Sequence, residues 1–427
     1  MRRVIAWVGL AFAAVTIAVW SAPETVDART SRHTARSGHH RVHHRRHRHH
    51  RRYLLPVSAN APTAEIVFDA DSGRVMAIAN ADQRVYPASL TKMMTLYLTF
   101  RALQEGWLHL NDAMPVSAYA ASASPTKLGL YPGQLVTVDD LIRGCVTESA
   151  NDAARTLAEN LDARFGRNLQ QLLRNDIAAA QADDAADAAS DPPSAEDAAE
   201  RAGEINEMRA LASGVMADGS EYDFARLMTL QARLLGMQDT VYRNASGLPD
   251  MEQVTTAPDM AMLAYALVHM PVQYYSYFSI QHFDFNGADH RNHNLRFLTS
   301  YDGADGIKTG YTQSGGFNVV DTARRGNRRL IAIVMGRQSL ATREEDVRTL
   351  LDYGFAQTGT VTAVSSTLNE DVLTVGSMLD FPTLQTSGVR RIAPQLPDLV
   401  RPEPATTAVS GRRPAPNRPA PISSAMR

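Results

Sequence analysis

Three short polar motifs, set far apart in the chain, constrain its fold more than any other feature. The first, Ser89-Leu90-Thr91-Lys92, opens a segment over residues 89–103 with the composition of a helix. Residues three apart lie on one helix face about a turn apart, so the ammonium group of Lys92 can reach the Ser89 hydroxyl. Unpaired backbone N–H groups and the helix dipole at the first turn also favour negative charge on an attacking serine oxygen. The motif therefore predicts a serine nucleophile with a lysine base.

This spacing is weak by itself, because a serine that opens a helix is usually an N-cap. Two further motifs strengthen the prediction: Ser149-Ala150-Asn151 and, much later, Lys308-Thr309-Gly310. The second offers a hydroxyl and an amide, and the third offers a further ammonium group, so each supplies something that the serine and lysine pair lacks. The fold must therefore bring together residues that lie more than two hundred positions apart.

Strand signals at both ends of the central region predict how the fold does this. Apolar runs over 66–69 and 74–79 flank a tight turn, and those over 317–322 and 330–335 flank a second polar turn. Helical periodicity lies between and after them, over residues 138–146, 150–161, 224–234, 258–270 and 343–355. This order predicts an α/β (α+β) fold: an antiparallel sheet built from both ends, flanked by helices, with a helical subdomain inserted.

Composition divides the 427 residues into four regions. An apolar run of 17 residues, 4–20, predicts that residues 1–28 are a signal peptide or an N-terminal anchor. Residues 29–55 are expected to form a disordered basic arm, and a catalytic domain is expected over 56–358. The Pro-rich residues 359–427 are expected to be a mostly disordered tail.

Charge is distributed unevenly along these regions. Residues 29–52 hold nine arginines, eight histidines and no acidic residue, which predicts a solvated arm. Such an arm could bind anionic lipid, acidic wall polymers or metal ions, or else be a spacer without a partner. This charge, directly after an apolar segment, opposes export under the positive-inside rule. The overall net charge is −2, so removing the +9 of the arm leaves −11. Residues 175–221, with twelve acidic residues against two arginines, predict an acidic insertion, partly helical and partly disordered.

Cys145 is the only cysteine, so the chain forms no internal disulfide. Its apolar surroundings over 141–146 predict a small buried hydrophobe rather than a reactive thiol. No cysteine and histidine spacing indicates a structural zinc site. We expect no metal site in the catalytic domain, no cofactor and no nucleic-acid partner.

Over residues 62–357 the sequence resembles the serine-type D-alanyl-D-alanine carboxypeptidases, the low-molecular-mass penicillin-binding proteins of bacterial wall maturation. The three motifs occur in the order that these enzymes use. Further segments also read like the family: Asn244-Ala-Ser-Gly-Leu-Pro, Asp305-Gly-Ile-Lys-Thr-Gly-Tyr-Thr and Leu350-Leu-Asp-Tyr-Gly-Phe. The resemblance implies a DD-peptidase/β-lactamase-like fold with the active site at the junction of helices and sheet.

The resemblance also implies a catalytic role for four residues. Ser89 would attack the carbonyl of the penultimate D-alanine and form an acyl-enzyme. Lys92 would accept the serine proton, which requires a pKa lowered by burial and by a neighbouring cation such as Lys308. Ser149 would relay the proton towards the leaving amine, and Asn151 would donate to the substrate amide and hold Lys92.

Substrate binding is assigned, in the same way, to the third motif and its surroundings: Lys308, Thr309, Gly310, Tyr311 and Arg343. Lys308 and Thr309 would meet the terminal carboxylate of the substrate, and Gly310 would leave room for it along the strand. The backbone N–H groups of Ser89 and Tyr311 would form the oxyanion hole. Arg343 would help to bind the carboxylate, unless it is an ordinary surface residue at the start of a helix.

The implied activity is removal of the terminal D-alanine from peptidoglycan stem pentapeptides by an exported enzyme, in the periplasm or on the outer face of the cytoplasmic membrane, with β-lactams as acylating inhibitors. A DD-endopeptidase that cleaves cross-links would use the same groups. A serine β-lactamase is less favoured, because Ala150 replaces an acidic residue and no glutamate for deacylation is evident. A non-catalytic wall-binding protein would have no chemical reason to keep all the motifs.

Two departures from the family pattern are notable. The acidic insertion over 175–221 is foreign to the usual compact core. Many relatives also carry a second β-rich domain and a C-terminal amphipathic helix, for which residues 359–427 are too short and too proline-rich. Any membrane anchor is therefore expected at the N-terminal end.

Overall fold

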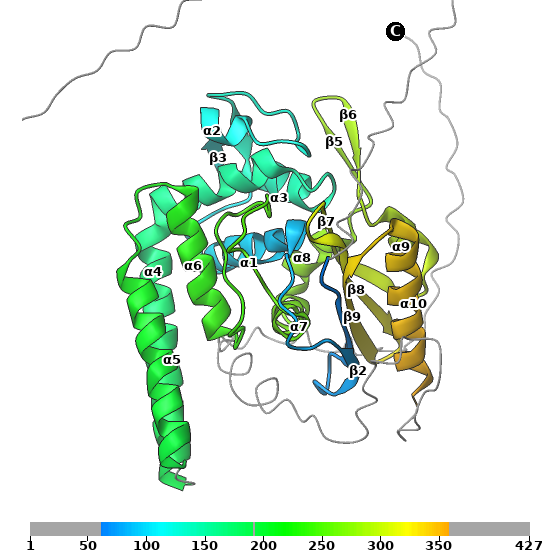
Figure 1. The fold of residues 1–427 in the computed structure, drawn as a ribbon. Coiled ribbons are helices and arrows are strands. Elements are labelled where there is room, and N and C mark those ends of the chain that lie inside the picture. The colour runs from blue at the N-terminus through cyan, green and yellow to red at the C-terminus, as the bar shows by residue number, and fades with distance from the viewer. Residues whose placement is uncertain (1–60, 191–192, 358–427) are drawn as a thin grey trace, which may run out of the picture. The chain divides into compact units, whose positions relative to one another are not determined.

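A five-stranded antiparallel sheet lies at the centre of the fold (Figure 1). The computed structural model describes residues 61–190 and 193–357, and every structural statement below concerns these residues. The strands follow the order β2-β1-β9-β8-β7. Their bounds are β1 Ala64–Asp69, β2 Val75–Ala79, β7 Ala304–Thr312, β8 Gly316–Arg325 and β9 Arg328–Arg337.

Strands from the two ends of the described chain pair with each other. Ala64 of β1 lies opposite Met335 of β9. Residues alternate between the two faces of the sheet, as strand geometry requires. Ile66 and Phe68 belong to one hydrophobic core, whereas Val67 belongs to the other. The prediction of one sheet built from both ends is confirmed.

Helices cover both faces of this sheet. Helix α10 (Leu340–Ala356) packs Val347 and Leu351 against one face. On the other face lie α1 (Thr91–Gln104) and α7 (Ala257–Val268). Helix α1 is buried from Thr91 to Leu103, so it is a central core helix rather than an amphipathic surface helix.

The remaining elements form the helical subdomain and its surroundings. Side-chain oxygens of Thr137, Ser194 and Ser220 accept a backbone N–H three residues on, which caps α3, α5 and α6. The bounds are α2 Ala118–Ala121, α3 Val138–Val146, α4 Asn151–Ser190, α5 Ala195–Ser213, α6 Glu221–Leu234, α8 Val272–Tyr275 and α9 Leu295–Ser300. The described residues also form two small antiparallel strand pairs: β3 Ala113–Pro115 with β4 Leu135–Thr137, and β5 His282–Phe285 with β6 Ala288–Arg291.

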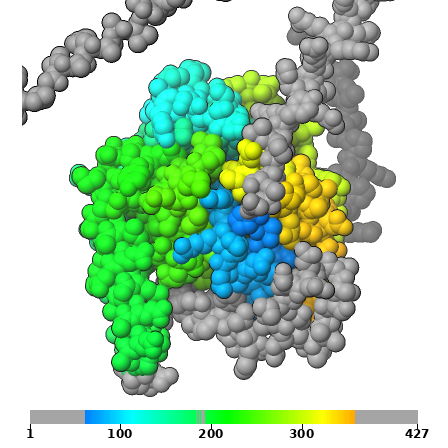
Figure 2. Space-filling model, viewed as in Figure 1, coloured from blue at the N-terminus to red at the C-terminus, as the bar shows by residue number. Residues whose placement is uncertain are grey.

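Helices α4 and α5 form a long antiparallel hairpin whose far part extends beyond α6 (Figure 1). Figure 2 shows its surface, in green, standing at one side of the sheet domain. Helix α4 has 40 residues, far more than the 150–161 helix that the sequence predicts. Most of the described residues of the expected acidic insertion, 175–190 and 193–221, are helical. Their alanine, glutamate and arginine content explains this, because these residues have high helix propensity.

The predicted signal or anchor segment 1–28, the basic arm 29–55 and the tail 359–427 lie outside the described residues. Among the helices that the structure does describe, none is both long and apolar enough to span a bilayer.

Candidate active site

Ser89 lies in a single 3-10 turn, Ala88–Leu90, that leads directly into α1. The sequence predicts that this serine opens the α-helix itself, so it sits one short turn earlier than expected. Ala88 has a φ of 51°, an unfavourable left-handed conformation for a residue other than glycine. Nζ of Lys92 lies 3.2 Å from Oγ of Ser89. The hydroxyl and the amine of the first motif therefore lie within hydrogen-bond distance of each other.

Lys92 is fully buried and has two further partners from distant segments. Its Nζ lies 2.8 Å from Oδ1 of Asn151 and 2.5 Å from the backbone carbonyl oxygen of Ser246. A neutral amine has two N–H groups and one lone pair. If the two N–H groups point to Asn151 and Ser246, the lone pair faces the Ser89 hydroxyl.

Burial lowers the pKa of Lys92 to about 8, although the carboxylates of Glu221 and Asp152 oppose the shift. Burial, together with repulsion between the Lys92 and Lys308 ammonium groups, lowers the pKa of Lys308 well below its ordinary value as well. Desolvation therefore favours the neutral form of the Lys92 amine, which is the form that can accept a proton.

Ser149 lies between α3 and α4, as predicted, with a φ of 57°. Its Oγ is buried and has no hydrogen-bond partner among the described residues. Asn151 attaches the loop to the segment that holds Ser124 and Thr126. It donates its backbone N–H to Thr126 O at 2.8 Å and its Nδ2 to Ser124 O at 3.1 Å. A buried hydroxyl without a partner is costly, so the Ser149 hydroxyl is available for a hydrogen bond to a group that enters the site.

Strand β7 carries the third motif alongside the nucleophile. Lys308 and Thr309 are buried, and Lys308 Nζ donates to the Thr309 carbonyl at 2.9 Å. A Cβ added at Gly310 would lie 3.1 Å from the Ser89 backbone nitrogen. The ring of Tyr311 packs against Phe317 at 4.4 Å between centroids. Gly310 thus lets the strand approach the nucleophile closely.

Arg343 lies in the first turn of α10 with only 3% of its surface exposed, which excludes the alternative of an ordinary surface residue. Burial lowers its pKa, and its charge lowers that of Lys308. Asp321, on β8, is a neighbour that the sequence does not reveal. Burial raises the pKa of Asp321 to about 7, and Asn294 donates Nδ2 to its Oδ1 at 2.6 Å.

A cavity of about 110 Å³ opens beside the nucleophile turn. Its lining comes from three segments: Tyr86, Pro87 and Ala88; residues 247–251 and Gln253; and Thr312 and Ser314. A side chain at position 247 in this wall would collide with the nucleophile turn, because the φ of Gly247 is +81° and an added Cβ would lie 1.9 Å from the Ala88 carbonyl oxygen. The cavity continues the site past Ser89 without including the catalytic side chains.

Three carboxylates outside the site, those of Asp162, Asp218 and Asp223, lie within 4.8 Å of one another. Each accepts a backbone N–H from residues 216–220. The bond from Gly219 N to Asp162 therefore ties the α5–α6 loop to α4. Cys145 is fully buried, as predicted, and burial raises the pKa of its thiol to about 12.

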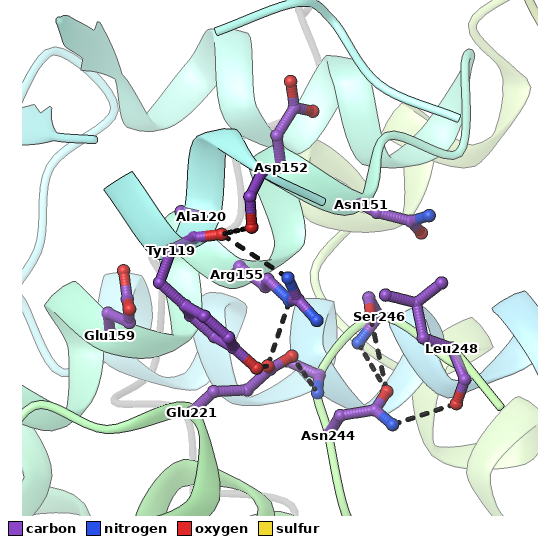
Figure 3. A network of polar contacts seen from close by, with 12 residues as sticks. Tyr119, Ala120, Asn151, Asp152, Arg155, Glu159, Glu221, Asn244, Ser246 and Leu248 are labelled. Atoms are coloured by element: carbon purple, nitrogen blue, oxygen red, sulfur yellow. Dashed lines mark hydrogen bonds and ion pairs between the residues drawn. The ribbon is translucent and has the colours of Figure 1, made fainter. Parts of the chain in front are cut away.

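Two contributors to the site are missed by sequence reasoning. The Ser246 carbonyl is a backbone atom, so residue type gives no signal for it. Its segment, Asn244-Ala-Ser-Gly-Leu-Pro, stands out only as a turn-rich loop with a family resemblance. Glu221 belongs to the expected acidic insertion, yet it is buried and bonds this loop (Figure 3).

Comparisons with known proteins find relatives from a single family. The family profile described as D-alanyl-D-alanine carboxypeptidase matches residues 55–163 and 208–339, leaving 164–207 of α4 and α5 unmatched. D-alanyl-D-alanine carboxypeptidase DacC of Escherichia coli is 31% identical over 307 residues, which is 70% of this chain and 63% of the relative. DacF of Bacillus subtilis is 27% identical over 309 residues, which is 70% of this chain and 63% of the relative. This chain thus matches somewhat less than two thirds of the length of either relative.

Solved structures give the same result. Penicillin binding protein 5 from Haemophilus influenzae has a TM-score of 0.54 at 28% identity, covering 71% of this chain and 73% of that one. Penicillin binding protein 6B from Escherichia coli has a TM-score of 0.53 at 27% identity, covering 71% of this chain and 79% of that one.

Proposed function

Because the chain belongs to the D-alanyl-D-alanine carboxypeptidase family, we propose that it is a serine DD-carboxypeptidase that removes the terminal D-alanine from peptidoglycan stem pentapeptides. One observation carries the proposal: buried Lys92 Nζ lies 3.2 Å from Ser89 Oγ, while Asn151 and Ser246 occupy its other contacts. Because the pKa of Lys92 is about 8, part of the population carries an uncharged amine at pH 7 and can accept the serine proton.

In the acylation step, Ser89 Oγ attacks the carbonyl carbon of the penultimate D-alanine and its proton passes to Lys92 Nζ. The tetrahedral intermediate then collapses as the carbon–nitrogen bond breaks. The leaving amine takes a proton from Lys92 through the Ser149 hydroxyl, whose Oγ has no partner among the described residues. The products are D-alanine and an ester on Ser89.

Deacylation reverses these roles with water as the nucleophile. Lys92 accepts a proton from the water that attacks the ester carbonyl, and the Ser89 oxygen leaves and is reprotonated. The backbone N–H groups of Ser89 and Tyr311 are proposed to stabilise the oxyanion in both steps. The close approach of β7 to the Ser89 nitrogen supports this assignment.

The terminal carboxylate of the substrate is proposed to bind Lys308, Thr309 and Arg343. Two buried cations and a buried hydroxyl on β7 and α10 provide the matching charge and donors. The free site disfavours the charged form of Lys308. An arriving carboxylate favours that form, so binding and protonation of Lys308 are coupled.

β-Lactams are proposed to acylate Ser89 in the same way as the peptide. The proposed setting is outside the cytoplasmic membrane, where peptidoglycan is found, with residues 1–28 as signal or anchor. Residues 29–52 are proposed to contact anionic wall polymers or lipid. Pull-down of the full chain with purified wall, compared with a variant lacking 29–52, tests this contact at low and high salt, because exposed charge contacts weaken with salt.

The activity is tested by D-alanine release from a pentapeptide that ends in D-Ala-D-Ala. The full chain is expected to release one D-alanine per peptide, and Ser89→Ala to release none. Cleavage of cross-linked dimers alone would favour the endopeptidase, and rapid turnover of penicillin would favour a β-lactamase. Absence of all three reactions would contradict the proposal.

A further inference from the structure

The backbone segment 244–248 supplies one of the atoms that orient the lysine base. Its Ser246 carbonyl accepts from Lys92, and its Gly247 packs against Ala88. The Asn244 side chain stabilises the turn, because Oδ1 accepts from Gly247 N at 2.7 Å and Nδ2 donates to Leu248 O at 3.0 Å. The position of this loop therefore determines where the Lys92 amine points.

Ala245, one residue before Ser246, is held from both sides. Its carbonyl accepts from Oγ1 of Thr95 at 2.7 Å, which ties the loop to α1 one turn after Lys92. Its N–H donates to Oε1 of Glu221 at 3.0 Å. Glu221 lies in the first turn of α6 and is only 5% exposed. A buried carboxylate is thus the anchor of the loop on the side of the helical subdomain.

The other oxygen of Glu221 is engaged by two helices of that subdomain, as Figure 3 shows. Oε2 accepts from the Tyr119 hydroxyl at 2.7 Å and pairs with Arg155 Nε at 3.1 Å. The Arg155 guanidinium also lies over the Tyr119 ring, 4.1 Å from its centroid. Tyr119 and Arg155 therefore fix Glu221, and Glu221 fixes Ala245.

We propose that Glu221 is a positioning residue for the lysine base: its carboxylate holds segment 244–248 so that the Ser246 carbonyl orients the Lys92 amine towards Ser89. This inference rests on the proposed role of Lys92 as the base. Glu221 itself touches neither the nucleophile nor any reacting atom.

The same carboxylate acts on Lys92 through its charge. Burial lowers the pKa of Lys92, and the negative charge of Glu221 raises it again. Removing the charge while keeping the hydrogen bond should therefore make Lys92 more acidic. The ionisable groups that act on Lys92 or Glu221 come from α2, α3, α4 and β7: Tyr119, Cys145, Asp152, Arg155, Glu159 and Lys308.

The chain has only three lysines, Lys92, Lys127 and Lys308, so its lysine side chains can be titrated individually by NMR after carbon-13 labelling. Lys127 is exposed, and the variant Lys127→Arg identifies its signal. The measurement needs no substrate. A failure of the proposed enzymatic activity would therefore not affect this test of the Glu221 contact.

Two substitutions separate the charge from the hydrogen bond. Glu221→Gln keeps an acceptor for Ala245 N, and we expect a lower midpoint for Lys92 with penicillin acylation at high pH within about twofold of the unmodified protein. Glu221→Ala removes the acceptor, and we expect acylation to fall about tenfold to a hundredfold at every pH, because a misplaced catalytic group is costly. Glu159→Gln, on α4 and bonded to Ser117, is the matched control and should change neither quantity.

A purely structural role for Glu221 gives a different result. It would lower the melting temperature of both variants and leave the Lys92 midpoint of Glu221→Gln unchanged, which would overturn the proposal. An equal midpoint shift in Glu159→Gln would overturn it as well. If Glu221→Ala does not fold, Glu221→Asp decides, because its shorter side chain keeps the charge and draws the acceptor away from Ala245 N. Acylation by Glu221→Asp should then fall at every pH, and acylation equal to that of the unmodified protein would overturn the proposal.

Discussion

Lys92 and Asn151, 59 residues apart in the chain, meet in a buried 2.8 Å hydrogen bond between Nζ and Oδ1. Lys92 comes from α1 and Asn151 begins α4, so this bond joins the nucleophile segment to the helical subdomain. It also takes up one N–H of the amine, as the proposed role of Lys92 as the base for Ser89 requires.

Asn151→Ala should therefore slow acylation by fluorescent penicillin by about a hundredfold, because Lys92 loses an acceptor that orients it. Asn160→Ala is a suitable control, since Asn160 is also buried on α4 and donates to Pro115 O at 3.0 Å. We expect Asn160→Ala to lower the melting temperature and to keep the acylation rate of the folded protein. Equal rates in the two variants would exclude the orienting role.

The rate of acylation should rise with pH through a midpoint near 8. Burial lowers the pKa of Lys92 to about 8, and only the neutral amine accepts the serine proton. Below the midpoint the rate should fall about tenfold per pH unit. Stopped-flow measurement of the second-order rate of penicillin acylation between pH 6 and 10 checks this, and a rate independent of pH over that range would count against Lys92 as the base.

Gly247→Ala should abolish penicillin labelling. Gly247 has a φ of +81°, and an added Cβ would lie 1.9 Å from Ala88 O, so the nucleophile turn or the loop must move. Gly287→Ala is the control, since Gly287 has a φ of +77° and nothing within 4 Å of an added Cβ. Both variants carry the strain of a left-handed alanine, about 1 kcal/mol. A difference in labelling therefore reports the clash alone, and similar labelling would show that the contact is dispensable.

Asp162 should make the protein less stable as pH rises from about 4 to 6. Burial, with smaller effects from Asp223 and Asp218, raises its pKa from 3.8 to about 6. Between these values the folded state binds more protons than the unfolded state, so the free energy of unfolding falls with rising pH. At pH 7 the free energy of unfolding is lower by an amount on the order of 3 kcal/mol because of this shift.

Asp162→Asn keeps an acceptor for Gly219 N but cannot ionise. Its gain in melting temperature over the unmodified protein should be larger at pH 7 than at pH 4.5. Asp82→Asn, at an exposed position, serves as the control. A gain that does not change with pH would show that Asp162 has no raised pKa.

Much of the fold follows from local patterns in the sequence. Helix α3 spans Val138–Val146, as the apolar periodicity indicates. Strands β8 and β9 lie where alternation and a polar turn place a hairpin. These elements are predictable because a half-buried helix or strand must repeat its apolar residues with its own period.

Other features depend on tertiary contacts and have no local signal. The length of α4 is hidden by a composition too polar to suggest a packed helix, although alanine favours helix. Burial decides whether Lys92 is a base and whether Arg343 is a surface residue, and burial is a property of the assembled fold. The Ser246 carbonyl and its anchor Glu221 act through backbone bonds, which residue type does not reveal.

The most direct test of the central claim, that Ser89 is the acylated nucleophile, is mass spectrometry of the full chain after reaction with benzylpenicillin. Trypsin cleavage after Arg84 and Lys92 isolates residues 85–92, which contain Ser89 as their only serine. We expect a single penicilloyl adduct on that residue and none in Ser89→Ala. An adduct on Ser149 or another residue, or labelling that persists in Ser89→Ala, would contradict the account.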